Sequence, residues 1–480
     1  RNWAQDVDLF ADIQFLRDRM DPEADLREET VQDHSLGELY GSANPTYSLQ
    51  SFLIERKANP TNHFVVGNDA GDADSIISAI SLAYIESMQS GQQLTPIVSI
   101  SKDCFTHDRP AVSLLFQLAG IDDPLANLLF IDDLTDMLRN DIKESSSSRS
   151  ITLVDQNTLN PSLKHFRENL IVTDIFDHHK DAKQFKETCD GDHRNIAFDG
   201  GHPLVASTTT LVAERLRDYP HLYSPAIGML LLGVILLDSV NLDEAVGKVT
   251  QRDGDAAADL LFQTDWSAAV SSSYLTHEDN GHITIDKDDL FEKLQHSKYD
   301  PKFWSSLSAE RALQLDYKEF HFHGTNQTHT SKKQGHRLGR HKKKFGISSI
   351  LVPGLDFMTR ERFYSSTLAF MESRQISLLG IMFAFYDGQG TLRRQLAFVS
   401  IERTVSLHEL MCSFLKSPAY KSVDLQLEKI QLPEGLGAGD IFSSKGAFWR
   451  KNVILFDQNN LSPSRKQIGP MLEDYFAELK

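Results

Sequence analysis

The sequence predicts an α/β protein of two domains, in which a parallel sheet covered by helices precedes an α+β domain. Three observations support this fold class. Short apolar segments alternate with helical patterns over residues 47–255, a polar and helical stretch follows, and strand-like segments dominate the rest. We therefore expect an N-terminal extension at 1–46, a first domain at 47–255, a helical linker at 256–310 and a second domain at 311–480.

The first domain alternates strand and helix patterns in the way that a parallel sheet with both faces covered requires. The predicted strands are 63–67, 95–100, 127–131, 151–154, 171–176 and 195–198, and the predicted helices are 74–89, 109–119 and 204–217. In the second domain we expect strands at 317–323, 346–353, 376–385, 394–401 and 424–432, with helices near 362–373 and 406–416.

Composition describes an ordinary globular protein of 480 residues, of which 40% are hydrophobic. The longest apolar run, 229–237, is too short to span a bilayer, so we expect no membrane partner. The three cysteines lie far apart, which argues against a disulfide framework and a cysteine zinc site and fits a reducing compartment. We expect a cytoplasmic monomer. The net charge of −18 would repel a polyanion except at a local cationic surface.

Polar side chains gather in the segment 65–75, where a predicted strand gives way to a predicted helix. Two glycines break the chain there, and the turn carries Asn68, Asp72 and Asp74. Open α/β sheets bind ligands at the carboxyl ends of their strands, and carboxylates in such a turn can ligate a hard divalent cation. The alternative is an Asx-rich turn that only caps the helix.

Three further apolar segments also end in an acid or an imidazole. Their ends, in chain order, are Asp155, then Asp177-His178-His179, then Asp238. Four such ends in one chain indicate metal-assisted hydrolysis. The pairs Asp122-Asp123 and Asp132-Asp133 also lie near apolar runs, but we interpret them as surface acids.

The order of these residues resembles the four motifs of the DHH phosphoesterases. They are N-x-x-x-D-x-D from Asn68, V-D-Q at 154–156, D-H-H at 177–179 and L-L-D-S at 236–239. The first motif usually begins with His, as in family II inorganic pyrophosphatases, whereas Asn68 resembles the eukaryotic, fungal-type cytosolic exopolyphosphatases and their prune relatives. The intact D-H-H favours an exopolyphosphatase, because prune-type proteins commonly alter the second His.

The C-terminal part resembles the DHHA2 domain. Segments 464–467 (S-R-K-Q) and 316–320 (D-Y-K-E-F) are similar to its two anion-binding segments, so the resemblance covers about 47–480. It implies an active site in the interdomain cleft, with His179, Lys318 and Arg465 catalytic. The same three residues and Lys466 would bind the substrate.

The resemblance also implies a site for two divalent ions. Asp155 would bridge them, and the remaining ligands would be Asn68, Asp72, Asp74, His178 and Asp238. A set rich in carboxylates and poor in imidazoles favours Mg²⁺ or Mn²⁺ over zinc.

The function that these patterns indicate is metal-dependent exopolyphosphatase activity, which releases orthophosphate from inorganic polyphosphate. The alternatives are a pyrophosphatase or a nucleotide phosphodiesterase on the same site, or a prune-like interaction protein with weak activity. A basic block at 332–344 is typical of a nucleic-acid patch or a localisation signal. It could equally be a disordered insertion, or collect polyphosphate. We expect polyphosphate and no nucleic acid as partner.

Overall fold

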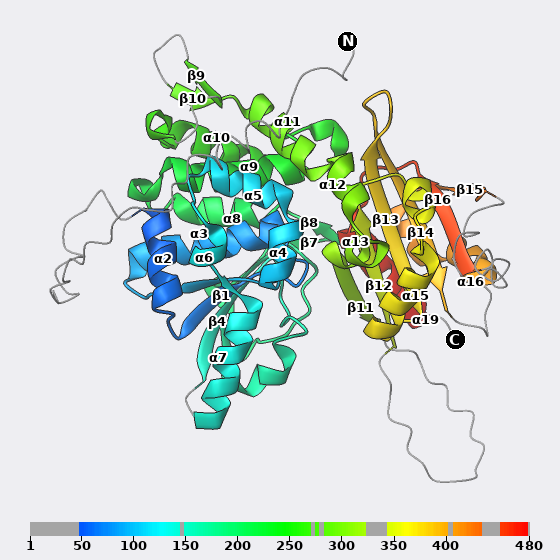
Figure 1. Ribbon diagram of the computed structural model, residues 1–480, viewed down its shortest axis with the longest axis horizontal. Helices are drawn as coiled ribbons and strands as arrows, with labels where there is room; N and C mark the ends of the chain where they lie inside the picture. The colour runs from blue at the N-terminus through cyan, green and yellow to red at the C-terminus, as the bar shows by residue number, and fades with distance from the viewer. Residues whose placement is uncertain are drawn as a thin grey trace, which may run out of the picture. The chain divides into compact units, whose positions relative to one another are not determined.

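A computed structural model of the protein describes residues 48–144, 148–269, 274–277, 283–322, 343–401, 407–433 and 452–478. The N-terminal part contains a parallel sheet and the C-terminal part a mixed sheet, each packed with helices (Figure 1). The predicted fold class is confirmed. The N-terminal extension predicted at 1–46 lies outside the described residues.

The first sheet has six strands in the order β3-β2-β1-β4-β5-β6, and every neighbouring pair is parallel. Its strands are β1 (His63–Val66), β2 (Thr95–Val98), β3 (Leu129–Phe130), β4 (Arg149–Val154), β5 (Leu170–Asp177) and β6 (Arg194–Ile196). The strand order reverses between β1 and β4. Ligands of open α/β sheets bind at such a reversal, so the segments that follow β1 and β4 are the expected place for a site.

Helices cover both faces of this sheet. The helices α3 (Ala73–Ser90) and α8 (Thr208–Leu216) pack on strands and on each other, and α9 (Pro225–Ser239) packs on both helices. The helix α7 (Ile131–Glu144) and the 3₁₀ segment η2 (Lys164–Asn169) contribute to a core cluster with β1, β3, β4 and β5. The remaining helices here are α2 (Leu49–Ala58), α4 (Lys102–Asp108), α5 (Pro110–Leu118) and α6 (Pro124–Asn127).

The longest apolar run of the sequence, 229–237, forms the middle part of α9. Almost every side chain of this helix is buried, because α3, α5, α8, α10 (Gln251–Gln263) and α11 (Lys287–Lys298) surround it. A helix that is apolar on all sides is a core helix when other helices enclose it. None of the helices in the described ranges has both the length and the apolar character needed to cross a membrane.

Three helices and a small hairpin connect α10 to the second sheet. The helices are α11, α12 (Pro301–Ser306) and α13 (Ala309–Leu315), as the helical pattern predicts. The hairpin of β9 (Leu275–His277) and β10 (Ile283–Ile285) was not predicted, because its strands have three residues each and too little alternation to detect. A second small hairpin joins β7 (Phe198–Asp199) and β8 (His202–Pro203).

The second sheet has the order β11-β12-β13-β14-β16-β15, in which β12 and β13 are parallel and the other pairs antiparallel. Its strands are β11 (Tyr317–Phe322), β12 (Lys343–Ile350), β13 (Leu378–Tyr386), β14 (Leu392–Ser400), β15 (Leu427–Ile430) and β16 (Val453–Gln458). The strand β16 is absent from the sequence prediction, although it lies between β14 and the edge strand β15.

Each face of the second sheet has its own hydrophobic core. Along β14, Leu396 and Phe398 contact one core, and the alternate residues Ala397 and Val399 contact the other. The first core includes α16 (Leu407–Phe414) and α19 (Arg465–Glu478). The second includes α13, α14 (Gly354–Met358) and α15 (Phe363–Arg374). The helix α17 (Pro418–Val423) packs against α19.

Candidate active site

The turn after β1 holds polar side chains at the carboxyl end of the first sheet. Two glycines allow it: a Cβ at Gly67 would lie 2.7 Å from the carbonyl oxygen of Ser75. Gly71 has a φ of +53°, and a Cβ there would overlap the side chain of Ile100. Asp72 is the N-cap of α3 and accepts a hydrogen bond from the backbone N–H of Ser75 at 3.0 Å. These contacts hold the turn in one conformation.

Asp155 follows β4 and lies at the centre of the site. Its φ is +55°, a left-handed conformation that Asp tolerates better than most residues. Its Oδ2 accepts hydrogen bonds from Ser75 Oγ at 2.7 Å and from the side-chain amide of Asn68. Its Oδ1 is buried and has no hydrogen-bond partner among the described residues. A buried carboxylate oxygen without a partner is costly, unless a cation binds there.

The structure orients Asn68 as a donor toward Asp155. Its Nδ2 donates to the carboxylate and to the backbone oxygen of Asp155, and its Oδ1 accepts from the N–H of Ala70 at 2.8 Å. As placed, Asn68 therefore supports Asp155, and a role as a metal ligand through its oxygen requires the amide to rotate.

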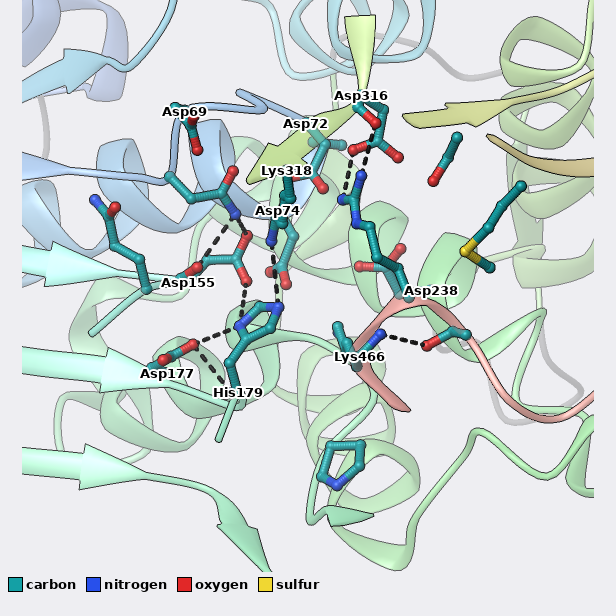
Figure 2. A pocket seen from close by; sticks show the side chains of 18 of the residues that line it. Asp69, Asp72, Asp74, Asp155, Asp177, His179, Asp238, Asp316, Lys318 and Lys466 are labelled. Atoms are coloured by element: carbon teal, nitrogen blue, oxygen red, sulfur yellow. Dashed lines mark hydrogen bonds and ion pairs between the residues drawn. The ribbon is translucent and has the colours of Figure 1, made fainter. Parts of the chain in front are cut away.

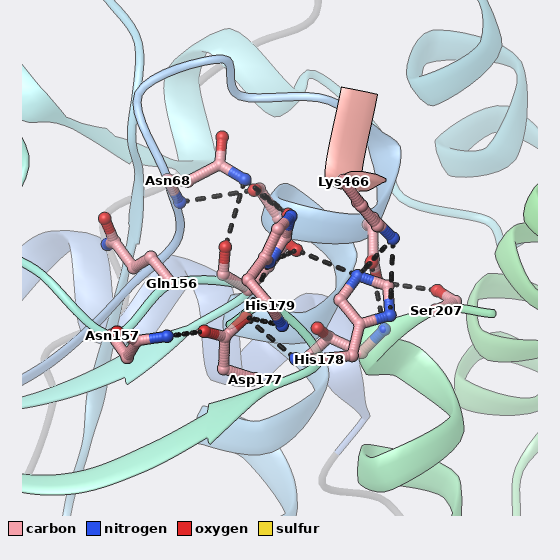
Figure 3. Close-up of polar contacts among 12 residues, drawn as sticks. Asn68, Gln156, Asn157, Asp177, His178, His179, Ser207 and Lys466 are labelled. Atoms are coloured by element: carbon pink, nitrogen blue, oxygen red, sulfur yellow. Dashed lines mark hydrogen bonds and ion pairs between the residues drawn. The ribbon is translucent and has the colours of Figure 1, made fainter. Parts of the chain in front are cut away.

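The D-H-H segment begins at Asp177, the last residue of β5, and this aspartate orients His179 (Figure 3). Asp177 is fully buried and accepts hydrogen bonds from the backbone N–H groups of both histidines and from His179 Nδ1 at 2.7 Å. Asn157 donates to the other oxygen of Asp177. With its Nδ1 bonded to Asp177, His179 presents Nε2 to the cavity.

His178 lies deeper than His179 and connects the two domains. Its Nε2 is 3.3 Å from Asp155 Oδ1 and 3.4 Å from Asp74 Oδ2, and its Nδ1 lies 3.2 Å from the backbone oxygen of Val205. Lys466 Nζ, from the start of α19, donates to the same Nε2. The nitrogen that faces both carboxylates is thus already next to a cation.

Asp74 has a structural role that the motif does not reveal. Its Oδ1 accepts hydrogen bonds from Ser207 Oγ at 2.6 Å and from the N–H of Thr209 at 2.9 Å, and its Oδ2 accepts from the N–H of Thr208 at 2.9 Å. The carboxylate therefore lies at the N-terminus of α8, where the helix dipole favours negative charge. The same residue joins α3, α8 and the site.

The second domain supplies three of the predicted cationic side chains. Lys318, on β11, places its Nζ 3.3 Å from His179 Nε2 (Figure 2). Arg465, at the start of α19, donates to the carboxylate and to the backbone oxygen of Asp316, each at 2.6 Å. This two-point contact holds the guanidinium in one orientation.

Of the ten predicted site residues, nine line one cavity of about 1030 Å³, and the tenth, His178, lies directly behind it. Asp238 lies in the last turn of α9. The nearest cation, Lys298 Nζ, lies 3.9 Å from its Oδ1. The cavity therefore brings the predicted carboxylates and imidazoles of the first domain together with the predicted cations Lys318, Arg465 and Lys466 of the second.

Crowded carboxylates shift one another's ionisation. Burial, followed by the neighbouring charge of Asp155, raises the pKa of Asp74 to about 7, although His178 acts in the opposite direction. Burial also raises the pKa of Asp72. Asp155 differs, because His178 and Lys318 outweigh the effect of burial and hold its pKa below the usual range. Without a cation, ionisation of Asp74 opposes folding as the pH rises from 3.8 to about 7.

The donor set fits a hard divalent cation. Ligating atoms of Asp155, His178 and His179 lie within 4.8 Å of one another. Asp155 Oδ1 lies 3.3 Å from His178 Nε2 and 3.5 Å from His179 Nδ1 and makes no hydrogen bond in the described residues. Burial and neighbouring carboxylates raise the pKa values of Asp72 and Asp74, and a bound cation would offset this concentration of negative charge. Oxygen ligands in this number suit Mg²⁺ or Mn²⁺.

Metal binding is expected to release protons, and to release more of them at pH 6 than at pH 8. Asp74 has a pKa of about 7 without metal, and the pKa of His178 lies above its usual value because Asp155 and Asp74 outweigh burial and Lys466. Asp74 therefore carries a proton at pH 6 that a divalent cation would displace, and it is already largely ionised at pH 8. Calorimetric titration of the protein with Mg²⁺ in buffers of different ionisation enthalpy measures the number of protons released. A release that does not change with pH, or that Asp74→Asn leaves unaltered, would contradict the assignment.

Two residues that the sequence analysis did not select also shape the site. Asp316, in a segment quoted only for its lysine, fixes Arg465. Arg109 is buried and donates to the backbone oxygens of Ala70, Gly71 and, at 2.9 Å, Leu315. It joins the turn after β1 to the second domain. No local motif marks Arg109, because its partners are backbone atoms of distant segments.

The acid pairs interpreted as surface acids lie outside the cavity. Asp123 caps α6, and Asp133 accepts a hydrogen bond from the N–H of Phe130 at 2.8 Å. Most of the basic block, residues 332–342, lies outside the described residues. Lys344, at its end, forms an ion pair with Glu319 at 3.0 Å.

Comparison with known proteins identifies relatives along most of the chain. The DHHA2 domain family matches residues 293–475. Mouse Exopolyphosphatase PRUNE1 is 25% identical over 417 residues, which cover 86% of this chain and 75% of the mouse protein. A Schizosaccharomyces pombe protein, provisionally named an exopolyphosphatase, is 25% identical over 430 residues, covering 86% of this chain and 91% of its own length.

Among solved structures, a provisionally named family II inorganic pyrophosphatase of Methanococcus jannaschii is 18% identical, with a TM-score of 0.49. The match covers 86% of this chain and 99% of that one.

Proposed function

The chain carries a DHHA2 domain and resembles the DHH-family phosphoesterases, and from that premise we propose that it is a metal-dependent exopolyphosphatase. It hydrolyses the terminal phosphoanhydride bond of inorganic polyphosphate and releases orthophosphate. Mouse PRUNE1 bears the name exopolyphosphatase, which supports phosphoanhydride hydrolysis as the reaction class.

One observation supports the proposal above the others: cations of the second domain contact the histidines of the D-H-H segment. Lys318 Nζ lies 3.3 Å from His179 Nε2, and Lys466 Nζ donates to His178 Nε2. A substrate between the carboxylate side and the cationic side would have its reacting phosphate near the candidate metal ligands. Its negative charge would be offset by lysine and arginine, as phosphoryl transfer requires.

The residues that would hold divalent ions are Asp72, Asp74, Asp155, His178 and Asp238, with Asn68 joining them once its amide rotates. When bound, Mg²⁺ or Mn²⁺ would polarise the phosphoryl oxygens and activate water. The preference between the two ions belongs to the proposal.

The protein's own side chains bind and orient the substrate in this reaction. Water attacks the terminal phosphorus, a new P–O bond forms, and the bond to the bridging oxygen breaks, while the attacking water loses a proton to solvent. The shortened chain leaves with that oxygen and its negative charge. Arg465, held by Asp316, binds phosphate oxygens through its planar guanidinium, while Lys318 and Lys466 act as point charges.

His179 has the geometry of a neutral hydrogen-bonding group. Burial and the charge of Lys318 lower its pKa to about 4, although Asp177 acts in the opposite direction. Its Nδ1–H donates to Asp177, which leaves Nε2 as an acceptor toward the cavity. A neutral imidazole there accepts from Lys318 or from a water molecule, so His179 can orient either group beside the substrate.

A side-by-side assay tests the function directly. Phosphate release would be measured with Mg²⁺ on long-chain polyphosphate, tripolyphosphate, pyrophosphate and a cyclic nucleotide. We expect kcat/KM for polyphosphate to exceed that for pyrophosphate by about tenfold or more, with no cleavage of the cyclic nucleotide. A preference for pyrophosphate would make the protein a pyrophosphatase. Cleavage of the cyclic nucleotide alone would make it a phosphodiesterase.

A further inference from the structure

A second group of cations lines the same cavity, and none of them was among the predicted site residues. We call it the Lys248 cluster: Lys248, Lys298 and Arg394. Lys248 lies between the 3₁₀ segment η5 (Glu244–Val246) and α10, Lys298 ends α11, and Arg394 is on β14. Three elements, distant in sequence, thus bring positive charge to one region of the cavity wall.

The charges of this cluster are poorly neutralised within the described residues. Lys248 has neither a hydrogen bond nor an ion pair there. Burial, followed by the charges of Arg394 and Lys298, lowers its pKa well below the ordinary value. Lys298 lies 3.9 Å from Asp238, the nearest carboxylate to the cluster. Like charges held together in a partly buried place destabilise a protein unless an anion binds between them.

Arg394 is an independent sign of a missing partner. It is 8% exposed, and its Nη1 donates to the backbone oxygen of Pro463 at 2.7 Å. Its Nε is buried and lacks any hydrogen-bond partner in the described ranges, and no described carboxylate forms an ion pair with it. An arginine with five donors in a fixed fork is well suited to phosphate oxygens.

The backbone around the cluster is shaped for close approach between the two domains. Gly247, just before Lys248, has a φ of +69°, and a Cβ there would lie 3.3 Å from Ser462 Oγ. Arg394 and Gln458 both donate to the oxygen of Pro463, in the segment that leads to Arg465 and Lys466. The Lys248 cluster therefore lies beside the proposed phosphate-binding residues. Lys466 adds its charge to the environment of Lys248 while its Nζ contacts His178.

We propose that the Lys248 cluster is a second anion subsite, which binds a phosphate further along the chain than the terminal pair. The inference rests on the proposed function and deepens it: the cavity selects chains of three or more phosphates over pyrophosphate. Pyrophosphate, held at the metal ligands and Lys466, is too short to use the cluster fully. A longer chain passes Lys466 and Asp238 and reaches Lys248 and Arg394.

Binding without catalysis tests the subsite. Calorimetry with Mg²⁺ would compare non-hydrolysable methylene analogues of tripolyphosphate and pyrophosphate for the parent, Lys248→Gln, the charge-retaining Lys248→Arg, and Lys421→Gln. Lys421 is an exposed lysine on α17, outside the cavity, and serves as the matched control. We expect Lys248→Gln to raise the Kd for tripolyphosphate by about tenfold or more, and by clearly less for pyrophosphate. Lys248→Arg should stay within about threefold of the parent, as should Lys421→Gln.

Thermal unfolding without anion separates a binding role from a structural one. If Lys248 is held for a ligand, Lys248→Gln relieves repulsion, so the Tm should rise. The stabilisation that tripolyphosphate adds should become smaller. A lower Tm with an unchanged ratio of the two Kd values would overturn the subsite.

The outcome of this experiment is separable from that of the proposed function. If the Kd values change as expected but the protein releases no phosphate, the result supports the subsite and contradicts the proposed exopolyphosphatase activity. If phosphate is released and Lys248→Gln weakens the binding of both substrates equally, the result supports the proposed activity and contradicts the subsite.

Discussion

Asp155→Asn is expected to leave less than about one per cent of parental phosphate release, because it removes a negative charge from the centre of the proposed metal site. Asparagine suits the substitution, since it tolerates the left-handed backbone at position 155 and can still accept the hydrogen bond from Ser75. The fold should therefore persist. Mg²⁺ affinity, measured by calorimetry, should fall together with turnover.

The matched control for this change is Asp132→Asn. Asp132 also follows an apolar run, but it is exposed and lies outside the cavity. Turnover and Mg²⁺ affinity should remain at the parental level in this variant. Asp155→Asn protein that shows a parental circular dichroism spectrum and more than about one per cent activity would remove Asp155 from the metal site.

Arg465→Ala is expected to lower kcat by about a hundredfold or more, equivalent to about 2.7 kcal/mol of transition-state stabilisation. Its guanidinium lines the cavity and is held in one orientation by Asp316. Arg465→Lys should restore only part of the rate, because an ammonium cannot bind phosphate oxygens through two parallel donors. Steady-state kinetics with tripolyphosphate measure both variants. A rise in KM with kcat unchanged would show that Arg465 binds substrate and transition state equally.

Asp316→Asn distinguishes contact with substrate from support of the fold. The substitution removes the charge opposite Arg465 and leaves the backbone acceptor of residue 316 in place. If Arg465 acts on the substrate and Asp316 only orients it, Asp316→Asn should reduce kcat less than Arg465→Ala does. Equal losses in kcat, accompanied by equal losses of thermal stability, would indicate that the pair mainly holds the second domain together.

The parallel sheet was predictable because its strands are short apolar runs separated by helical patterns. The polar ends of β1 and β4 could be matched to one another, since parallel strands bring their carboxyl ends to the same edge. The expectation of acids and imidazoles in one cavity followed from that geometry and from the family resemblance. By contrast, β16 lies between β14 and β15 in the sheet, although it is the last strand in sequence. Its apolar residues 453–456 resemble those of the predicted strands, so the strand itself was detectable, whereas its position between β14 and β15 has no local signal.

The contacts that complete the site depend on tertiary structure. Lys466 and His178 are 288 residues apart, and nothing in either local sequence shows that their side chains meet. The role of Asp74 at the N-terminus of α8 and the contact of Arg109 with backbone oxygens are invisible for the same reason. The Lys248 cluster joins single residues from three elements, so no motif could reveal it. Sequence patterns find residues that act in local groups, and miss those gathered by packing.

Phosphate release from long-chain polyphosphate, by protein stripped of metal and then supplied with Mg²⁺ or Mn²⁺, tests the central claim most directly. The account predicts no release in EDTA and release of orthophosphate, one unit at a time, once either ion is added. The Asp155→Asn protein should show no release under any of these conditions. Equal release with and without metal, or no release from the intact protein with either ion, would contradict the proposal of a metal-dependent exopolyphosphatase.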